Sequence, residues 1–199
     1  TLPVSIGRSY IIIVSYNIVL LFTAFLILRH RTAKPLEDAK PTDDMKNKKF
    51  LFCHLKNQDD VDLLFNYYRK QENTTSIDQI DGGEIDPGIR PDKTLEYFCR
   101  LLGADLDKAQ KYTAQLGIEN LKTAKRTPEN IKKIYFAVSM ATGNERVVIK
   151  NFLDRESRAF EEAALAILKE EKEQGRAILY LSDEIFQTKG AEKLTDRVG

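Results

Sequence analysis

Cysteine is scarce in this sequence. Only Cys53 and Cys99 occur among 199 residues, which is too few for the disulfide framework of a small secreted domain. Each has a phenylalanine neighbour and is expected to be a small buried hydrophobe. Together with His54 and His30, the two cysteines lack the C-x₂₋₄-C spacing of zinc sites, and no familiar motif around Cys99 indicates a nucleophile.

An excess of one charge and the motifs of known catalytic classes are also lacking. The 31 basic and 30 acidic residues leave a formal net charge of +1, which argues against the clustered basic surface that broad nucleic-acid binding requires. Gly82 and Gly83 are not followed by lysine and serine or threonine, as in a phosphate-binding loop. No G-x-S-x-G, H-E-x-x-H or protein-kinase signature occurs. We therefore predict no enzymatic activity and no cofactor.

What the sequence does have is one long apolar run. Residues 10–28, YIIIVSYNIVLLFTAFLIL, contain no charge, proline or glycine. A helix of this length rises about 28 Å, close to the hydrocarbon thickness of a bilayer. A signal peptide would have a shorter apolar core and small residues at a cleavage site, and a buried core helix would be amphipathic. We predict a single transmembrane helix, with Asn17 as a candidate contact to another membrane helix.

The segments around this run give the expected organisation. A leader at 1–9 precedes it, and a basic, proline-containing linker follows at 29–41. Lysine and arginine are more frequent after the run than before it, which by the positive-inside rule places the C-terminal domain on the cytoplasmic or mitochondrial-matrix side. The opposite orientation stays open, because an anchor that also directs export can override the rule. We expect an integral membrane protein with an α-helical domain at 42–190 and a tail at 191–199.

The polar domain contains many of the residues that begin and end helices. Helix starts are indicated by capping residues, namely Thr42, Asp92, Asp105, Thr127 and Asn144. The expected helices cover 42–56, 58–70, 92–102, 105–117, 127–143 and 144–175. Residues 50–55 have a buried strand as the rival interpretation, and 177–186 are either helical or a short strand followed by a helix. The predicted fold class is mainly α, a single N-terminal transmembrane helix followed by a multi-helix domain with one possible short strand.

Residues 71–91 form the longest irregular stretch. Its four carboxylates are candidate ligands for Ca²⁺ or Mg²⁺: Asp78, Asp81, Glu84 and Asp86. With Asp78 at the first position of an EF-hand loop, the third, fifth and twelfth positions hold Ile80, Gly82 and Ile89, which cannot bind the ion through their side chains. We expect a cluster of turns here rather than a metal site.

Five basic residues between 122 and 133 are the candidate partner-binding residues: Lys122, Lys125, Arg126, Lys132 and Lys133. They form either a solvated face or a contact to acidic lipid or an acidic partner. The leading hypothesis is a non-catalytic, single-pass accessory subunit of a larger membrane complex, such as a mitochondrial energy-converting complex or a secretion machine. Its partners would be other membrane and soluble subunits and the lipid bilayer, without nucleic acid. The alternative is a membrane-tethered adaptor or receptor that binds a protein or peptide through a helical groove, and an enzyme with an unfamiliar site is the third class.

Overall fold

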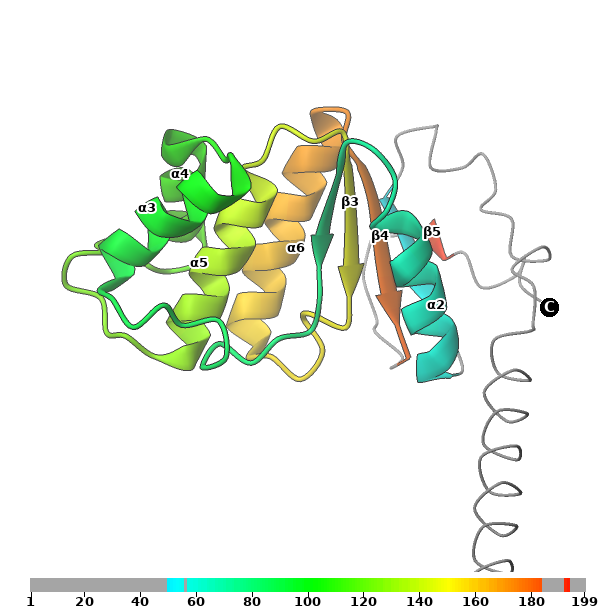
Figure 1. The fold of residues 1–199 in the computed structure, drawn as a ribbon, viewed down its shortest axis with the longest axis horizontal. Helices are drawn as coiled ribbons and strands as arrows, with labels where there is room; N and C mark the ends of the chain where they lie inside the picture. Colours follow the sequence, from blue (N-terminus) through cyan, green and yellow to red (C-terminus); the bar gives the residue numbers. More distant parts are fainter. Residues whose placement is uncertain (1–49, 56, 184–191, 194–199) are drawn as a thin grey trace, which may run out of the picture. The chain divides into compact units, whose positions relative to one another are not determined.

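Five parallel strands form one sheet in the computed structural model, which describes residues 50–55, 57–183 and 192–193 (Figure 1). All of these residues fall in the unit 41–199. The strand order is β2-β3-β4-β1-β5 and every pairing is parallel. The strands are β1 (Phe50–His54), β2 (Thr74–Ile77), β3 (Arg146–Lys150), β4 (Ala177–Ser182) and β5 (Glu192–Lys193).

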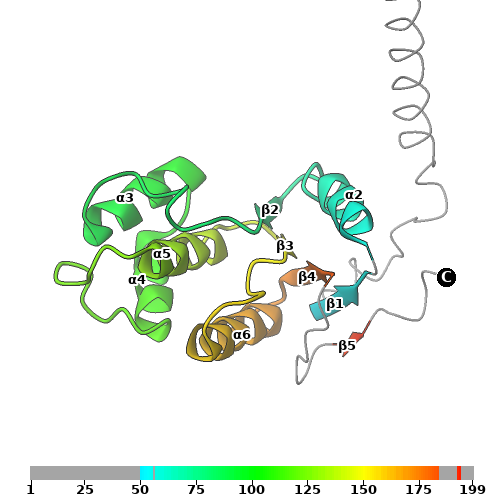
Figure 2. The ribbon, with the colours of Figure 1, turned by 90° about the horizontal axis from the view of Figure 1, so that it is seen from below.

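Helices cover both faces of the sheet, as a parallel sheet requires. They are α2 (Gln58–Tyr68), α3 (Pro91–Leu102), α4 (Leu106–Gln115), α5 (Pro128–Met140) and α6 (Arg158–Glu173). Figure 2 shows α2 on one face of the strands and α6 on the other. The helices α3, α4 and α5 form a group beside the β2 edge, and α5 packs on β2.

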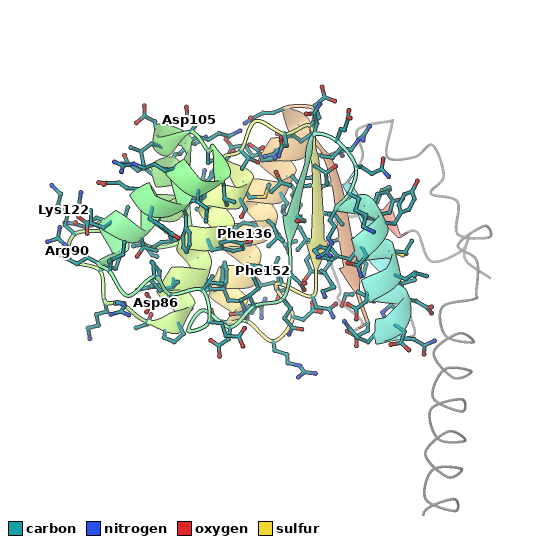
Figure 3. The ribbon with its side chains drawn as sticks, in the orientation of Figure 1. Asp86, Arg90, Asp105, Lys122, Phe136 and Phe152 are labelled. Atoms are coloured by element: carbon teal, nitrogen blue, oxygen red, sulfur yellow. The ribbon has the colours of Figure 1, made fainter. Side chains whose placement is uncertain are left out.

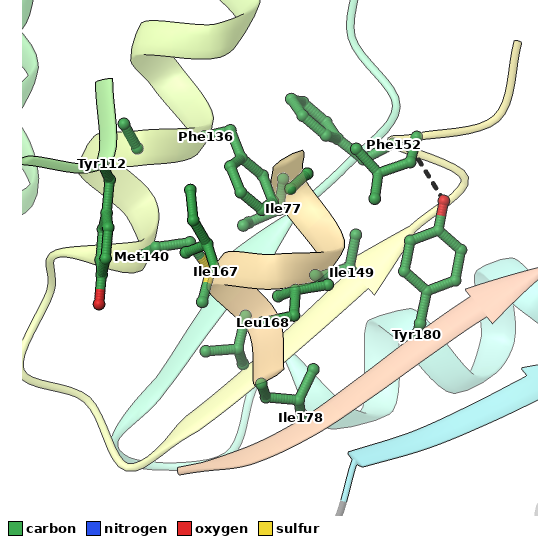
Figure 4. Packing of buried hydrophobic residues seen from close by; sticks show 14 of the residues in the cluster. Ile77, Tyr112, Phe136, Met140, Ile149, Phe152, Ile167, Leu168, Ile178 and Tyr180 are labelled. Atoms are coloured by element: carbon green, nitrogen blue, oxygen red, sulfur yellow. Dashed lines mark hydrogen bonds between the residues drawn. The ribbon is translucent and has the colours of Figure 1, made fainter. Parts of the chain in front are cut away.

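Alternate residues of the strands enter two separate cores. Leu179 and Leu181 of β4 pack with Phe65 of α2. Ile178 and Tyr180, which point to the opposite face, belong to a second cluster with residues of α4, α5 and α6 (Figure 4). A third cluster joins α3, α4 and α5 to one another. Two buried faces explain why β4 is apolar at almost every position rather than at every second one.

Two of the predicted helix starts are confirmed in detail. The Asp105 side chain accepts a hydrogen bond from the N–H of Lys108 at 2.7 Å, at the start of α4. The Thr127 hydroxyl accepts one from the N–H of Asn130 at 3.2 Å, at the start of α5. Both bonds satisfy backbone donors that a helix start leaves without a partner.

The predicted fold class, mainly α, is wrong, because the described chain is built on a parallel sheet. The predicted helix at 144–175 contains strand β3, and α6 begins only after Ser157. The β-branched residues Val147, Val148 and Ile149 favour a strand. The helix was predicted from the spacing of apolar residues alone, which did not take this preference into account. The strand interpretation of 50–55 is confirmed by β1, and β2 lies within the stretch predicted to be irregular.

Within the described ranges, no helix is both long and apolar enough to cross a bilayer. The membrane helix predicted at 10–28, including Asn17, lies outside the described residues, and so do the leader at 1–9 and the linker at 29–41.

Candidate functional site

The carboxyl ends of the parallel strands meet at one edge of the sheet, and ligands of α/β folds bind beyond this edge. Helix α2 starts close to this edge, four residues after the end of β1. Polar residues end or follow β2, β3 and β4 there: Asp78, Lys150, Asn151, Asp154 and Ser182. We call this group the carboxyl edge.

Lys150 is the central cation of the carboxyl edge. Its Nζ lies 2.8 Å from Oδ1 of Asp62 on α2 and 2.8 Å from Oδ1 of Asp78 after β2. It also lies 5.1 Å from the centre of the Phe65 ring. Burial lowers the pKa of Lys150, but the hydrogen bonds and charges of Asp62 and Asp78 outweigh burial, so the pKa is raised. Lys150 therefore stays charged and ties α2 to the two strands.

Asn151 directly follows β3 in a left-handed backbone conformation, with φ of 48°, which asparagine tolerates better than most residues. Only 4% of the residue is exposed. Its Nδ2 donates to Oε1 of Gln58, the first residue of α2, at 2.9 Å. Its Oδ1 is buried and has no hydrogen-bond partner among the described residues. This oxygen can accept one hydrogen bond, but it carries no charge.

Asp154 is the third group of this edge and is almost fully buried. It accepts hydrogen bonds from the Tyr180 hydroxyl and the Ser182 hydroxyl, both at 2.8 Å. The Tyr180 oxygen in turn accepts from the N–H of Leu153 at 2.9 Å, the bond drawn in Figure 4. Burial, together with the Asp154 charge, raises the pKa of Tyr180 well above its ordinary value. The arrangement holds the turn after β3 against the end of β4.

The start of α2 is strongly acidic. Asp59 and Asp60 lie in its first turn, and Asp62 follows two residues after Asp60. The N-cap residue, Asn57, makes no side-chain capping bond to the backbone; its Nδ2 donates instead to Asp60 at 3.3 Å. The carboxylates therefore occupy the electrostatically positive end of the helix.

The four candidate metal ligands of the 71–91 stretch do not gather around one point. Asp78 binds Lys150, and Asp81 accepts the N–H of Gly83 at 2.8 Å. Asp86 is paired with Arg126 at 2.7 Å, and this hydrogen bond lowers the pKa of Asp86. Glu84 and Asp81 line a hollow of about 570 Å³ at the start of α5. No group of three His, Cys, Asp or Glu residues in the described ranges is placed to hold a metal ion.

The five candidate partner-binding residues do not form one patch either. Lys132 pairs with Glu156 and Lys133 with Glu129, and both lysines are largely buried. Arg126 forms an ion pair with Asp86. Lys122 lines a second hollow, of about 690 Å³, together with Arg90, and both project from the outer side of the helical group (Figure 3). Lys125 is exposed.

Sequence reasoning missed the carboxyl edge because it assigned 144–175 to one helix. Lys150, Asn151 and Asp154 therefore fell inside the predicted helix and were not singled out. The available signal was the run of Val147, Val148 and Ile149 followed by polar residues, which is typical of a buried parallel strand that ends at a functional edge.

No protein-family model matches this sequence, and no curated protein matches it significantly. Solved structures nevertheless share its fold. A Pyrococcus furiosus structure described as an ABC transporter ATP-binding protein aligns with a TM-score of 0.56 and 13% identity, over 74% of this chain and 85% of that chain. The complex of the archaeal ribosomal stalk protein aP1 with the ribosome recycling factor aABCE1 aligns with a TM-score of 0.49 and 8% identity, over 68% of this chain and 33% of that chain.

These findings correct the predicted function and location. The sequence predicted a non-catalytic, single-pass membrane accessory subunit of a mitochondrial or secretion complex, with an integral membrane location. The described chain instead has a fold shared with an ATP-binding protein, and its described helices include none that could span a membrane. Neither finding supports membrane subunits or lipid as partners. What this chain shares with known proteins is the parallel α/β fold of an ABC transporter ATP-binding protein.

Proposed function

We propose that this chain is a non-catalytic α/β domain that acts by binding protein partners and neither binds nor hydrolyses ATP. ATP is the ligand to consider first, because the similar Pyrococcus furiosus structure is described as ATP-binding. Proteins hold nucleotide phosphates with free backbone N–H groups, supplied by a glycine-rich loop and the helix start that follows it. In this chain we take the start of α2, the helix that follows β1, as the position to test.

The start of α2 has the wrong charge for a phosphate, and this observation carries the proposal. Asp59 and Asp60 occupy the first turn, so an incoming phosphate would meet negative charge where a binding site offers donors. The sequence has no glycine between Gly7 and Gly82. The chain ahead of α2 therefore lacks the residues that let a backbone approach phosphate oxygens closely.

The other groups that a magnesium nucleotide needs are already engaged. Lys150 is neutralised by Asp62 and Asp78, and Asp154 is occupied by two hydroxyl donors. The Asn151 amide oxygen is a neutral acceptor, whereas Mg²⁺ in such sites is held by carboxylates and phosphate oxygens. The carboxyl edge does not fit a magnesium nucleotide.

Titration of the purified chain with Mg-ATP tests the proposal. Calorimetry should show no saturable heat, and the melting temperature should not rise with ATP concentration. A site filled at about 100 times its Kd would add about 2.7 kcal/mol to the unfolding free energy, which corresponds to several degrees in Tm. The Pyrococcus furiosus protein, assayed in parallel, is the positive control.

Saturable binding of Mg-ATP, or phosphate release above that of buffer, would refute the proposal. Mg-ADP and Mg-GTP should be titrated in the same way, because the acidic start of α2 disfavours every polyphosphate. If the negative charge at the start of α2 is the cause, none of the three nucleotides should bind.

A further inference from the structure

Exposed apolar side chains are concentrated on one pair of helices. The large hydrophobic residues that are exposed in the described chain are Leu63, Tyr67, Ile89, Tyr97, Leu101, Leu102 and Leu106. Five of these seven lie between 89 and 106, around α3 and the start of α4. Single exposed hydrophobic residues are ordinary, but a concentration of this kind marks an interaction surface.

The outward side of α3 combines two of these apolar residues, Tyr97 and Leu101, with positive charge. Three basic and two apolar residues follow one another at helical spacing along it, and we call them the α3 stripe: Arg90, Lys93, Tyr97, Arg100 and Leu101. Tyr97 is 47% exposed and Leu101 is 64% exposed. Asp92 and Glu96 lie beside the stripe and pair with its Arg90 and Lys93, and the opposite side of the helix is buried.

The basic residues of the α3 stripe are available to a partner. Arg100 makes no ion pair within the described ranges. Arg90 pairs with Asp92 and Lys93 with Glu96, but the two basic side chains are 68% and 53% exposed. Ion pairs this exposed contribute little and exchange readily. Tyrosine and arginine are also the residue types that most often supply the binding energy at protein interfaces.

We infer that the α3 stripe binds an acidic, amphipathic segment of a protein partner. The inference rests on the proposed role, in which the chain acts through protein partners. A partner segment with carboxylates beside leucine-like residues would pair with Arg100, compete with Asp92 and Glu96 for Arg90 and Lys93, and cover Tyr97 and Leu101. A second copy of this chain does not fit, because it would bring a second Arg100 to the interface and, among the described residues of α3, no carboxylate free to pair with the first.

Site-specific cross-linking of the full chain tests this inference. The photoreactive residue p-benzoylphenylalanine replaces Tyr97 in cells that naturally make the protein, and the cross-linked peptide is sequenced by mass spectrometry. We expect a segment with acidic and apolar residues at helical spacing. The same residue at Tyr67 on α2, which is 37% exposed, is the matched control and should not cross-link this segment.

A synthetic peptide of the cross-linked segment then gives the affinity by fluorescence anisotropy. Leu101→Ser and Arg100→Glu should each weaken binding by about tenfold or more, and a peptide with one glutamate changed to lysine should recover binding to Arg100→Glu. The melting temperatures of both variants verify that they fold. Cross-links to lipid, to a second copy, to a basic segment or to nothing would overturn the inference, and so would affinities unchanged by both substitutions.

Vesicles of phosphatidylcholine and phosphatidylserine test whether the α3 stripe binds a membrane surface instead of a protein. Sedimentation of the chain with these vesicles that is lost in Arg100→Glu would assign the stripe to anionic lipid and overturn the inference. If the α3 stripe does not bind the expected segment, the result of the ATP titration still stands, because the stripe takes no part in that experiment. ATP binding would refute the proposed function without changing what cross-links at Tyr97.

Discussion

Removing the Glu171 carboxylate should destabilise the fold strongly. Glu171 is fully buried near the end of α6, where it accepts from the Tyr112 hydroxyl and lies 2.7 Å from Nζ of Lys108. Its other oxygen lies 2.5 Å from Nη1 of Arg176, a residue that is 8% exposed. Glu171→Ala leaves the Arg176 charge buried without its counter-ion, which costs about 3–5 kcal/mol.

The neighbouring Glu170 provides the control. It pairs with Lys111, and the two side chains are 29% and 56% exposed, so Glu170→Ala should cost no more than about 1 kcal/mol. Urea unfolding followed by circular dichroism measures both variants. With a slope of about 2 kcal/mol/M, the midpoint for Glu171→Ala should fall by about 2 M. Equal midpoints for Glu171→Ala and Glu170→Ala would refute the reasoning.

The same buried pair predicts how stability depends on pH. Burial raises the pKa of Glu171, but Lys108, Tyr112 and Arg176 together outweigh burial, so the pKa is lowered. An unfolded glutamate has a pKa of about 4.3. The contribution is therefore complete above that value and is lost as the pH falls through the lower, folded pKa. Glu171→Gln should show a shallower loss of stability in acid than the unaltered chain, and parallel acid curves would contradict this assignment.

Two further substitutions test the carboxyl edge and the stretch before α3. Lys150→Met should reduce the unfolding free energy by roughly 1–2 kcal/mol in urea, a modest value because Asp62 and Asp78 are partly exposed; an unchanged midpoint would mean that these ion pairs contribute nothing. Gly82→Ala should cost about 1–3 kcal/mol, because a Cβ at this position would lie 1.9 Å from a backbone oxygen of the first residue of α5. Gly83→Ala, whose Cβ has no contact shorter than 3.4 Å, should be nearly neutral, and equal losses for the two alanines would argue against close backbone packing.

The features that the sequence predicted correctly depend on residues close together in the chain. Asp105 and Thr127 cap helices through bonds to backbone groups three residues away, so their role follows from local pattern. Strand β3 was missed because a short run of consecutive apolar residues occurs both in buried strands and in helices. The β-branched side chains of Val147, Val148 and Ile149 favour the strand, and the pairing of β3 with β2 and β4 fixes it.

The candidate site could not be predicted for a different reason. Lys150 and Asp62 are 88 residues apart in the sequence, and they meet because α2 and β3 pack together. The helix predicted at 58–70 is confirmed by α2. The sequence did not indicate that the acidic start of this helix lies at the carboxyl edge of a sheet, beside Lys150.

The clamp that Lys150 makes between α2 and the strands has a consequence for timing. In a protein driven by a nucleotide, binding and release of phosphate shift the position of a helix relative to its sheet. This shift controls the rate at which partners bind and dissociate. Here the ion pairs of Lys150 with Asp62 and Asp78 join α2 to the strands, so under the proposed function this contact would not change with a nucleotide. The lifetime of a partner complex would then be set by its own dissociation rate.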